Sequence, residues 1–404
     1  MFESMLMAPS DPILGLSTIF RNDIRKKKIN LGIGVYINEH NEAPILESVK
    51  HAEDFLLKKE MNKNYLNIEG IHAFNNATQS LLFGQDESII SKERIRTVQA
   101  PGGTGALRII SECIAKHFNI YFGRKQRIWI SDPTWVNHKN IFIASGLELH
   151  TYPYYNQYKH ALDFEKFLDT LNCSVKATDI VLLHCCCHNP TGIDPTIEQW
   201  KILSENSEKN GWIPLFDLAY QGFDTDLKND LQGLHIFCKH NSELIVCNSY
   251  SKNFGLYNER VGACTIIAQN NDHAERALSQ LKSTIRANYS NPPAHGASIV
   301  STILTNPILY SIWENELKCM REHIKNMRFL LIQNLNHNNQ HNKPNFDFIT
   351  NQKGMFAYMD LNSNQVTKLR KNSGIYLVDS GRINLAGLSK QNIQYVCESI
   401  RDLF

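Results

Sequence analysis

The 404-residue chain has no marked excess of either charge and no long apolar run. Its 42 Lys and Arg residues are nearly balanced by 40 Asp and Glu residues, which leaves a formal net charge of +2. This balance does not support a nucleic-acid or membrane-surface role, because either would require a basic excess on one face. No stretch reaches the ~20 apolar residues that a membrane-spanning helix needs. We therefore expect neither nucleic acid nor a membrane as a partner.

The N-terminal segment lacks the features of an export or import signal. Residues Met1 to Ser10 hold no basic region followed by an apolar core, and they contain no Arg. The ten cysteines are scattered without the spacing of a disulfide framework. Such cysteines are typical of reduced thiols in a cytosolic protein. We therefore expect a cytoplasmic location.

The sequence also lacks internal repeats and long linkers, but it has enough apolar residues for a sizeable core, at 42%. Short strand patterns alternate with amphipathic helical patterns through the middle of the chain. The buried strands are expected at residues 127–131, 180–184, 213–216, 243–247 and 262–267. Such alternation predicts an α/β fold with a mainly parallel sheet covered by helices on both faces.

Both ends of the chain depart from this alternation. The N-terminal part holds a strand-like run at Leu31–Tyr36, and the C-terminal part has short strands, one of them expected at Phe346–Ile349. The Asn- and His-rich segment Asn334–Asn345 is the most loop-like. We expect three parts along the chain. These are an N-terminal arm with the first part of a small domain (1–45), a large domain (46–315) and the remainder of the small domain (316–404).

Polar segments follow several of the expected strands, at the edge where open α/β sheets bind ligands. The first is Pro101–Gly105, just before a helical pattern. Its glycines allow close backbone approach, and the helix N-terminus offers free N–H groups to a phosphate. It lacks the lysine of a Walker loop and the third glycine of a dinucleotide fingerprint, where Arg108 stands. An ordinary strand-to-helix turn is an equally good interpretation.

Asn189 and Asp217 follow or end two further strands. Asn189 can donate to a ring oxygen, although a simple Asn–Pro turn is the alternative. Asp217, when buried, needs a cationic partner, and a protonated pyridine nitrogen is one. Tyr220 can reach the phenolic oxygen on the other side of such a ring. The alternative role for Asp217 is a helix N-cap.

Lys252 follows the strand expected at 243–247 and completes the set. Desolvation and nearby positive charge can lower the pKa of such a lysine, which then forms an imine with an aldehyde. Ser249 and Arg260 suit a phosphate dianion. A solvated surface lysine is the common alternative. Together, the segments hold an imine-forming lysine, an acid for a ring nitrogen, donors for a ring oxygen and a phosphate cradle, which are the requirements of pyridoxal 5'-phosphate (PLP).

The run SYSKNFGLYNERVGAC, Ser249 to Cys264, resembles the cofactor-lysine motif of the aspartate aminotransferases, class I enzymes of PLP fold-type I. Further matches follow in order along essentially the whole chain, at Asp11–Leu16, Ile29–Tyr36, Pro101–Arg108, Cys186–Gly192, Asp217–Phe223, Ile285–Gly296 and Ser380–Gly387. The bacterial aspartate type fits best. The resemblance implies a large domain with a mainly parallel seven-stranded sheet flanked by helices, and a small α+β domain.

The resemblance also implies cofactor roles. Lys252 holds PLP and shuttles a proton, Asp217 pairs with the ring nitrogen with His138 behind it, and Tyr220 and Asn189 donate to the ring oxygen. Trp135 stacks on the ring and lines the substrate site, although a lone Trp is more often a core aromatic. The implied phosphate cradle consists of Gly103, Thr104, Ser249 and Arg260, with Tyr65 reaching the phosphate of the neighbouring subunit.

Two arginines are implied to select the substrate. Arg382 resembles the residue that holds the α-carboxylate, and Arg286 the one that crosses a homodimer interface to hold the side-chain carboxylate. Asn189 and Gly34 resemble further substrate-site residues. Paired Arg–carboxylate contacts favour dicarboxylic amino acids and 2-oxo acids. In isolation, a surface ion pair is the better interpretation of either arginine.

The function implied is transfer of the amino group of L-aspartate to 2-oxoglutarate by a ping-pong mechanism, with Lys252, Asp217 and Tyr220 as catalytic residues. An aromatic or dual-specificity aminotransferase is a close alternative. A catalytically inactive PLP-binding protein, and a β-lyase or decarboxylase of the same fold, are more distant ones. No metal site is expected in the run His184–His188, because adjacent strand residues point to opposite faces.

Overall fold

The computed structural model describes residues 2–8, 11, 13–38, 42–59, 61–84, 93–336 and 344–404. The chain forms two compact units. The larger unit consists of Pro44–Asn189 and Ile193–Arg321, and the smaller unit of Met1–Ala43, Pro190–Gly192 and Glu322–Phe404. Each unit has its own strands and helices. No helix in the described ranges combines the length and apolarity of a membrane span.

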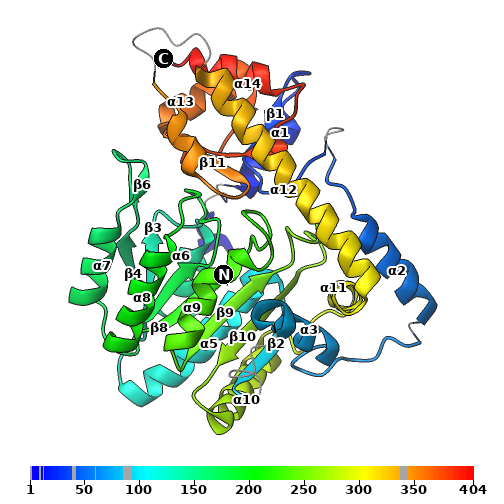
Figure 1. Ribbon diagram of the computed structural model, residues 1–404, viewed down its shortest axis with the longest axis vertical. Helices are drawn as coiled ribbons and strands as arrows, with labels where there is room; N and C mark the ends of the chain where they lie inside the picture. Colours follow the sequence, from blue (N-terminus) through cyan, green and yellow to red (C-terminus); the bar gives the residue numbers. More distant parts are fainter. Residues whose placement is uncertain are drawn as a thin grey trace. The chain divides into compact units, whose positions relative to one another are not determined.

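The larger unit is built on a seven-stranded sheet with the order β2-β10-β9-β8-β7-β3-β4 (Figure 1). The strands are β2 (Ile95–Pro101), β3 (Arg127–Asp132), β4 (Glu148–Pro153), β7 (Ile180–His184), β8 (Ile213–Leu218), β9 (Leu244–Ser249) and β10 (Val261–Ile267). Neighbouring strands are parallel except at β10, which is antiparallel to both β2 and β9. The predicted mainly parallel seven-stranded sheet is confirmed.

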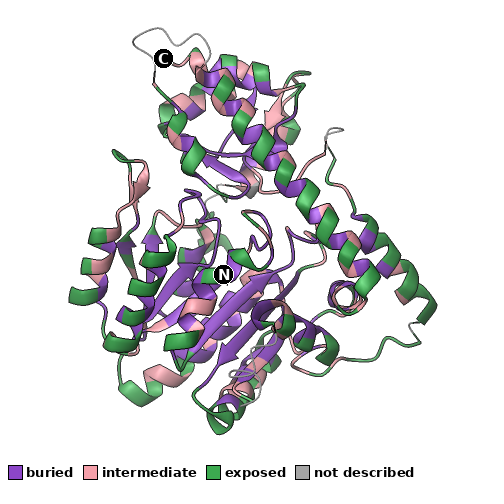
Figure 2. Ribbon diagram, in the orientation of Figure 1, coloured by how far each residue is buried: buried purple, intermediate pink, exposed green. Residues whose placement is uncertain are grey.

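The central strands are mostly apolar because helices cover both faces of the sheet. Every residue of β7, β9 and β10 is buried, and Figure 2 shows these strands as a continuous buried layer. Such unbroken apolar runs, rather than alternating ones, are typical of strands covered on both sides. The sequence therefore located these strands to within one or two residues of their observed ends.

Helices of the larger unit pack on the two faces of this sheet. They are α3 (His72–Phe83), α5 (Gly102–Phe122), α6 (Asn137–Ala144), α7 (Phe164–Cys173), α8 (Ile197–Asn210), α9 (Gln232–His240), α10 (Asn271–Asn288) and α11 (His295–Thr305), whereas α2 (Glu47–Lys59) packs against α11. On one face, α5, α6 and α10 share a core cluster with the strands, which includes Ile110, Phe142 and Leu281. On the other face, Trp200 of α8 and Phe237 of α9 pack on Phe216 of β8. A short hairpin, β5 (Tyr155–Asn156) with β6 (Ala161–Leu162), follows β4.

The smaller unit combines two short sheets with helices from both ends of the chain. Strand β1 (Ile29–Asn30) pairs in parallel with β12 (Ile375–Tyr376), and β11 (Phe356–Tyr358) pairs antiparallel with β13 (Arg382–Asn384). The helices are α1 (Leu14–Asn22), α13 (Ser363–Lys368) and α14 (Ile393–Arg401), and α12 (Pro307–Asn336) runs from the larger unit into this one. Shorter helical turns lie at Phe2–Ser4, Asp347–Asn351, Leu369–Ser373 and Leu385–Gly387 here, and at Asn229–Leu231 in the larger unit.

The expected strand Leu31–Tyr36 is wrong over its whole length. The strand ends at Asn30, and the following segment is irregular because side chains take up its carbonyl groups. Arg382 donates to the carbonyl of Gly32 at 2.8 Å, and Asn384 donates to those of Ile33 and Val35 at 2.8 and 2.7 Å. A backbone satisfied in this way needs no partner strand.

Two predictions for the C-terminal part of the chain also differ from the structure. Phe346–Ile349 is not a strand, because a 3-10 helix occupies Asp347–Asn351. Of the expected loop Asn334–Asn345, the first residues complete α12, which ends at Asn336, and residues 337–343 lie outside the described part of the chain. Short apolar runs of this kind do not distinguish strand from helix by periodicity alone.

Shortening a side chain in the central sheet tests this description of the core. Leu182 of β7 is fully buried and belongs to the cluster shared with α5 and α6. We expect Leu182→Ala to lower the free energy of unfolding by about 2–5 kcal/mol, through lost burial and a residual cavity. Urea unfolding followed by circular dichroism measures this change. Ile143→Ala, at a side chain that is 61% exposed, is the control, and its effect is expected to stay within about 0.5 kcal/mol. Equal effects of the two substitutions would contradict the core assignment.

Candidate active site

The carboxyl ends of three neighbouring strands bring the predicted cofactor residues together in the larger unit. In the register of the sheet, His184 of β7 lies opposite Asp217 of β8, and Asp217 lies opposite Cys247 of β9. Lys252 follows β9, and its Nζ atom lies 5.2 Å from the centre of the Tyr220 ring. Parallel strands end at the same edge, which is why residues far apart in the sequence meet here.

Asp217 is a buried carboxylate with a defined partner. Its Oδ2 atom lies 3.0 Å from Nε2 of His138, which is itself fully buried on α6. Burial acts to raise the pKa of Asp217, but the hydrogen bond from His138 and the nearby charge of Lys252 outweigh it, and the pKa is lowered. Asp217 lies within β8, and no described helix begins there, so the helix-cap alternative does not apply.

A chain of hydrogen bonds extends behind His138. Its Nδ1 atom lies 2.8 Å from the hydroxyl of Thr134, and the same hydroxyl lies 3.2 Å from Nε2 of His184. Burial lowers the pKa of His184 to about 3, so its ring is neutral. The sequence analysis identified His138 but missed Thr134 and a supporting role for His184. The position of His184 at the end of β7 was the signal that could have indicated it.

Tyr220 and Asn189 face each other across the ends of β8 and β7. The side-chain amide of Asn189 donates to the Tyr220 hydroxyl at 3.4 Å, and both side chains are buried. The backbone N–H of Asn189 donates to Nδ1 of His184 at 3.4 Å. The two predicted ring-oxygen donors are therefore adjacent to each other and connected to the histidine chain.

The residues predicted to bind a phosphate meet where β2 ends and α5 begins. The helix begins at Gly102, three positions before the end of the predicted glycine-rich turn, so Gly103 and Thr104 lie in its first turn. Gly102 has a φ of +74°, and a Cβ atom there would collide with the guanidinium of Arg260. A Cβ on Gly103 would lie 3.0 Å from the side chain of Ser249. Glycine is thus needed for the helix end to approach these side chains.

Arg260 and two serines complete this arrangement. Arg260 donates to the Ser251 hydroxyl at 3.2 Å, and Ser249 lies 3.2 Å from the same hydroxyl. A helix N-terminus with a guanidinium and hydroxyl groups is a suitable donor set for a phosphate group. Ser251 was not among the predicted site residues, although it lies within the run Ser249–Lys252.

Trp135, and the two residues predicted to serve a second subunit, are more exposed than the groups described above. Trp135 is partly buried against the core cluster, with its ring 5.2 Å from that of His138 in an edge-to-face arrangement. Tyr65 is 93% exposed. Arg286, in the last turn of α10, is exposed and donates to the hydroxyl of Ser290. Large exposed side chains of this kind are available to a second subunit.

Arg382 and Gly34 lie in the smaller unit. Arg382 is buried, with its guanidinium 4.0 Å from the centre of the Phe356 ring. A Cβ atom on Gly34 would lie 2.9 Å from the same ring. The two residues predicted to contact substrate from the small domain therefore flank one aromatic side chain.

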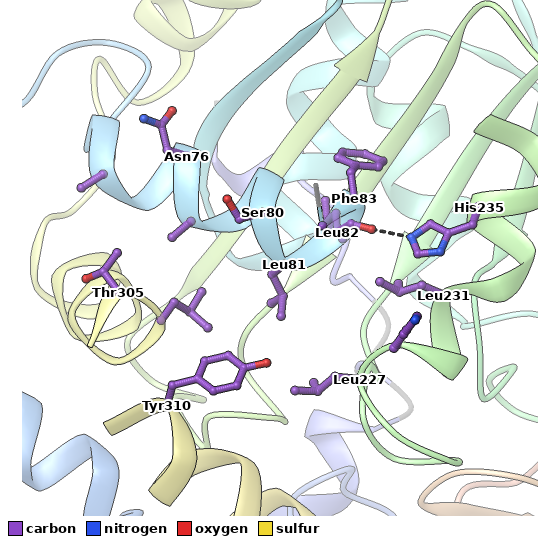
Figure 3. A pocket seen from close by; sticks show the side chains of 15 residues that line it. Asn76, Ser80, Leu81, Leu82, Phe83, Leu227, Leu231, His235, Thr305 and Tyr310 are labelled. Atoms are coloured by element: carbon purple, nitrogen blue, oxygen red, sulfur yellow. Dashed lines mark hydrogen bonds between the residues drawn. The ribbon is translucent and has the colours of Figure 1, made fainter. Parts of the chain in front are cut away.

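The larger unit also contains a cavity away from the predicted site residues. A cavity of about 860 Å³ lies between α3, the segment Leu227–His235 and the start of α12. Figure 3 shows its lining, with Tyr310 on one side and His235 bound to the carbonyl of Leu82 at 2.7 Å on the other. None of the predicted site residues lines it. Among the described residues, no group of three or more His, Cys, Asp or Glu is arranged to hold a metal ion.

The chain is similar to known proteins over nearly its full length. Residues 26–400 match the family model of aminotransferase class I and II. Aspartate aminotransferases of Escherichia coli and Haemophilus influenzae are 52% and 50% identical to it, each over 99% of both chains. These identities extend far beyond the individual motifs.

Solved structures show the same fold. The structure of an aromatic-amino-acid aminotransferase from Burkholderia pseudomallei, covalently bound to pyridoxal phosphate, matches with a TM-score of 0.94 and 41% identity over 100% of this chain and 99% of that one. The cytoplasmic aspartate aminotransferase of Saccharomyces cerevisiae matches with a TM-score of 0.95 and 35% identity over 100% and 98%. The chain therefore belongs to the class I and II aminotransferase family.

Proposed function

We propose that this protein is a PLP-dependent aspartate aminotransferase, which transfers the amino group of L-aspartate to 2-oxoglutarate and releases oxaloacetate and L-glutamate. The observation that carries the proposal is the cluster of Lys252, the Asp217–His138 pair and the glycine-lined anion site at one edge of the sheet. Full-length identity of 50–52% to bacterial aspartate aminotransferases supports the choice of substrate.

The residues of the larger unit fit PLP in their donor chemistry. The start of α5 at Gly103 and Thr104, with Ser249, Ser251 and Arg260, would hold the phosphate. When bound, PLP supplies a conjugated ring that accepts electrons from the substrate α-carbon. The lowered pKa of Asp217 keeps it ionised, so that it can hold a proton on the ring nitrogen.

The remaining cofactor contacts come from three other segments. Tyr220 and Asn189 would donate hydrogen bonds to the ring oxygen, and Trp135 would pack against the ring. Lys252 provides the amine that attaches the cofactor and then carries the proton to and from the substrate α-carbon. Its attachment point just beyond β9 places this amine at the same edge as Asp217.

Substrate selection depends on two cations. Arg382 binds the α-carboxylate beside Gly34, and Arg286 binds the side-chain carboxylate in the site of a second subunit, whose phosphate Tyr65 also contacts. The protein is then a homodimer with shared active sites and takes dicarboxylic amino acids and 2-oxo acids. The high exposure of Tyr65 and Arg286 supports this assignment. The cytoplasm is the proposed compartment, since the ten cysteines are free thiols.

A second candidate, an aromatic or dual-specificity aminotransferase, is favoured by one observation. Structures of aromatic aminotransferases match the whole chain with TM-scores of 0.92–0.94. Their identities of 38–41% are below the 50–52% of the bacterial aspartate enzymes. The relative turnover of aspartate and phenylalanine by the purified enzyme separates the two candidates.

A spectral titration tests the reaction directly. Aspartate should convert the cofactor's visible band to the shorter-wavelength amine form, and 2-oxoglutarate should restore it. Lys252→Ala should still bind PLP but lose turnover by at least about 10⁴-fold, the upper range for one positioned acid–base group. Lys209→Ala, at an exposed position on α8, is the control and should retain full activity. Full activity of Lys252→Ala would remove this lysine from the mechanism.

Neutralising Arg286 tests substrate selection. We expect Arg286→Leu to lower kcat/KM for aspartate by about 30- to 1000-fold, because the variant loses a charge-assisted pairing of about 2–4 kcal/mol. Turnover of phenylalanine should change little, since its side chain carries no charge. Steady-state kinetics with both amino acids measures the ratio. A parallel loss for both substrates would contradict the assignment.

Mixing two inactive variants tests whether the active site is shared between subunits. Lys252→Ala and Arg286→Leu subunits, unfolded and refolded together, should form hybrid dimers with one intact site each. Random pairing then restores about a quarter of the wild-type activity toward aspartate, as two-fold symmetry requires. Each variant refolded alone is the control. If Arg286 serves its own subunit, the hybrids contain no intact site and activity does not return.

A further inference from the structure

The loop that carries Tyr220 makes a sharp turn directly after β8. Its N–H···O bond from Phe223 to the Tyr220 carbonyl measures 3.1 Å. Gly222 has a φ of +91°, a conformation that suits glycine and strains other residues. A Cβ atom at Gly222 would also collide with the side chain of Leu317. The conformation of the backbone next to Tyr220 therefore depends on the hydrogen bonds that Gly222 makes.

Two buried charged side chains bind both polar groups of Gly222. Its N–H donates to Oδ2 of Asp230 at 2.8 Å, and its carbonyl accepts from Nη1 of Arg321 at 2.8 Å. Asp230 is 5% exposed and Arg321 is 9% exposed. Burying charged groups is costly unless hydrogen bonds compensate. Here an acidic side chain and a basic side chain each form a hydrogen bond with the same glycine.

Asp230 holds more of the loop than this glycine. Its carboxylate also accepts the backbone N–H groups of Asp224 at 3.2 Å and Thr225 at 2.9 Å. The backbone carbonyl of Asp230 lies 3.7 Å from Sγ of Cys185, which immediately follows His184. The residue therefore connects the turn after Tyr220 with the end of β7.

The same turn is linked to the segment that carries Lys252. The side-chain amide of Asn253 donates to the carbonyl of Gln221 at 3.5 Å. The carbonyl of Asn253 in turn accepts from the buried indole N–H of Trp313 at 2.7 Å. Movement of the Gln221–Gly222 turn would therefore displace both Tyr220 and the chain next to Lys252.

We infer that Asp230, with Arg321 on the opposite side of Gly222, is a positioning residue for the reaction and fixes the Tyr220 hydroxyl where it can donate to the cofactor's ring oxygen. The inference rests on the proposed function, in which Tyr220 has this role. Asp230 acts on Tyr220 through the backbone of Gly222. A hydrogen-bond donor in an active site must be held within about half an ångström of its productive position. The residues that hold such a donor therefore affect the rate of the reaction.

The experiment compares three variants of the holoenzyme. Asp230→Asn keeps the shape but replaces one acceptor oxygen with an N–H₂ group that faces the N–H donors. Tyr220→Phe removes the proposed donor itself. Asp179→Asn is the matched control, because Asp179 is also buried and accepts from Trp129 and from the backbone of Lys176, but it precedes β7 at the opposite edge of the sheet.

Three readouts distinguish positioning from general stability. They are the pKa of the pH-dependent change in the cofactor's visible absorbance, kcat and KM for aspartate, and the dissociation constant of PLP. Tyr220→Phe should raise the absorbance pKa, because loss of the donor strengthens the cofactor's own hold on the proton. Asp230→Asn should shift it in the same direction and lower kcat by about 10- to 100-fold, as expected for a misplaced group. Asp179→Asn should lower the unfolding temperature, leave the absorbance pKa unchanged and change kcat by no more than about twofold.

Each outcome decides the inference. If Asp230→Asn behaves like Asp179→Asn while Tyr220→Phe changes the absorbance pKa, the inference is wrong and the proposed function stands. If Tyr220→Phe has no effect either, the assigned role of Tyr220 is wrong. Should Asp230→Asn fail to fold, Arg321→Lys replaces it, because lysine keeps the charge but not the geometry of the bond to Gly222. An unchanged absorbance pKa and kcat in Arg321→Lys would then overturn the inference.

Discussion

The carboxylate of Asp217 is held ionised inside the protein by a hydrogen bond from His138. An unpaired carboxylate at the end of a buried strand would become protonated or destabilise the fold, because burial disfavours the charged form. His138, Thr134 and His184 form the chain that prevents this. The proposed chemistry needs a negative charge next to the ring nitrogen. The chain of hydrogen bonds keeps that charge on Asp217.

The sheet positions the other groups relative to that carboxylate. Strands β7, β8 and β9 run parallel and end at one edge, so that Asn189, Tyr220 and Lys252 follow neighbouring strand ends. Helix α5 begins at the end of β2, which pairs with β10 in the same sheet. Because Arg260 directly precedes β10, the anion site and the lysine are attached to one rigid framework. Rigid strands hold functional groups more accurately than long loops do.

Much of the fold could be predicted because its signals are local. The apolar runs of β7 to β10 and the glycines before α5 each reflect a short-range requirement, either burial on both faces or close backbone approach. The strand predictions were wrong where contacts with distant residues, rather than the local pattern, decided the conformation. Leu31–Tyr36 looks like a strand, but Arg382 and Asn384 take up its carbonyl groups. Phe346–Ile349 is too short for its periodicity to distinguish a strand from the helical turn that is present.

The candidate site was predictable as a set of residue types, because imine formation, ring-nitrogen pairing and phosphate binding require particular side chains at strand ends. Lys252, Asp217 and the glycine-rich start of α5 could therefore be selected as candidates from their residue types and their positions after predicted strands. The tertiary structure alone decided which side chains support them, since such partners come from distant segments. Arg321 binds Gly222 across 99 positions of the chain, and no local pattern records that contact. Hydrogen bonds of this kind depend on how the elements pack, and packing is a property of the whole fold.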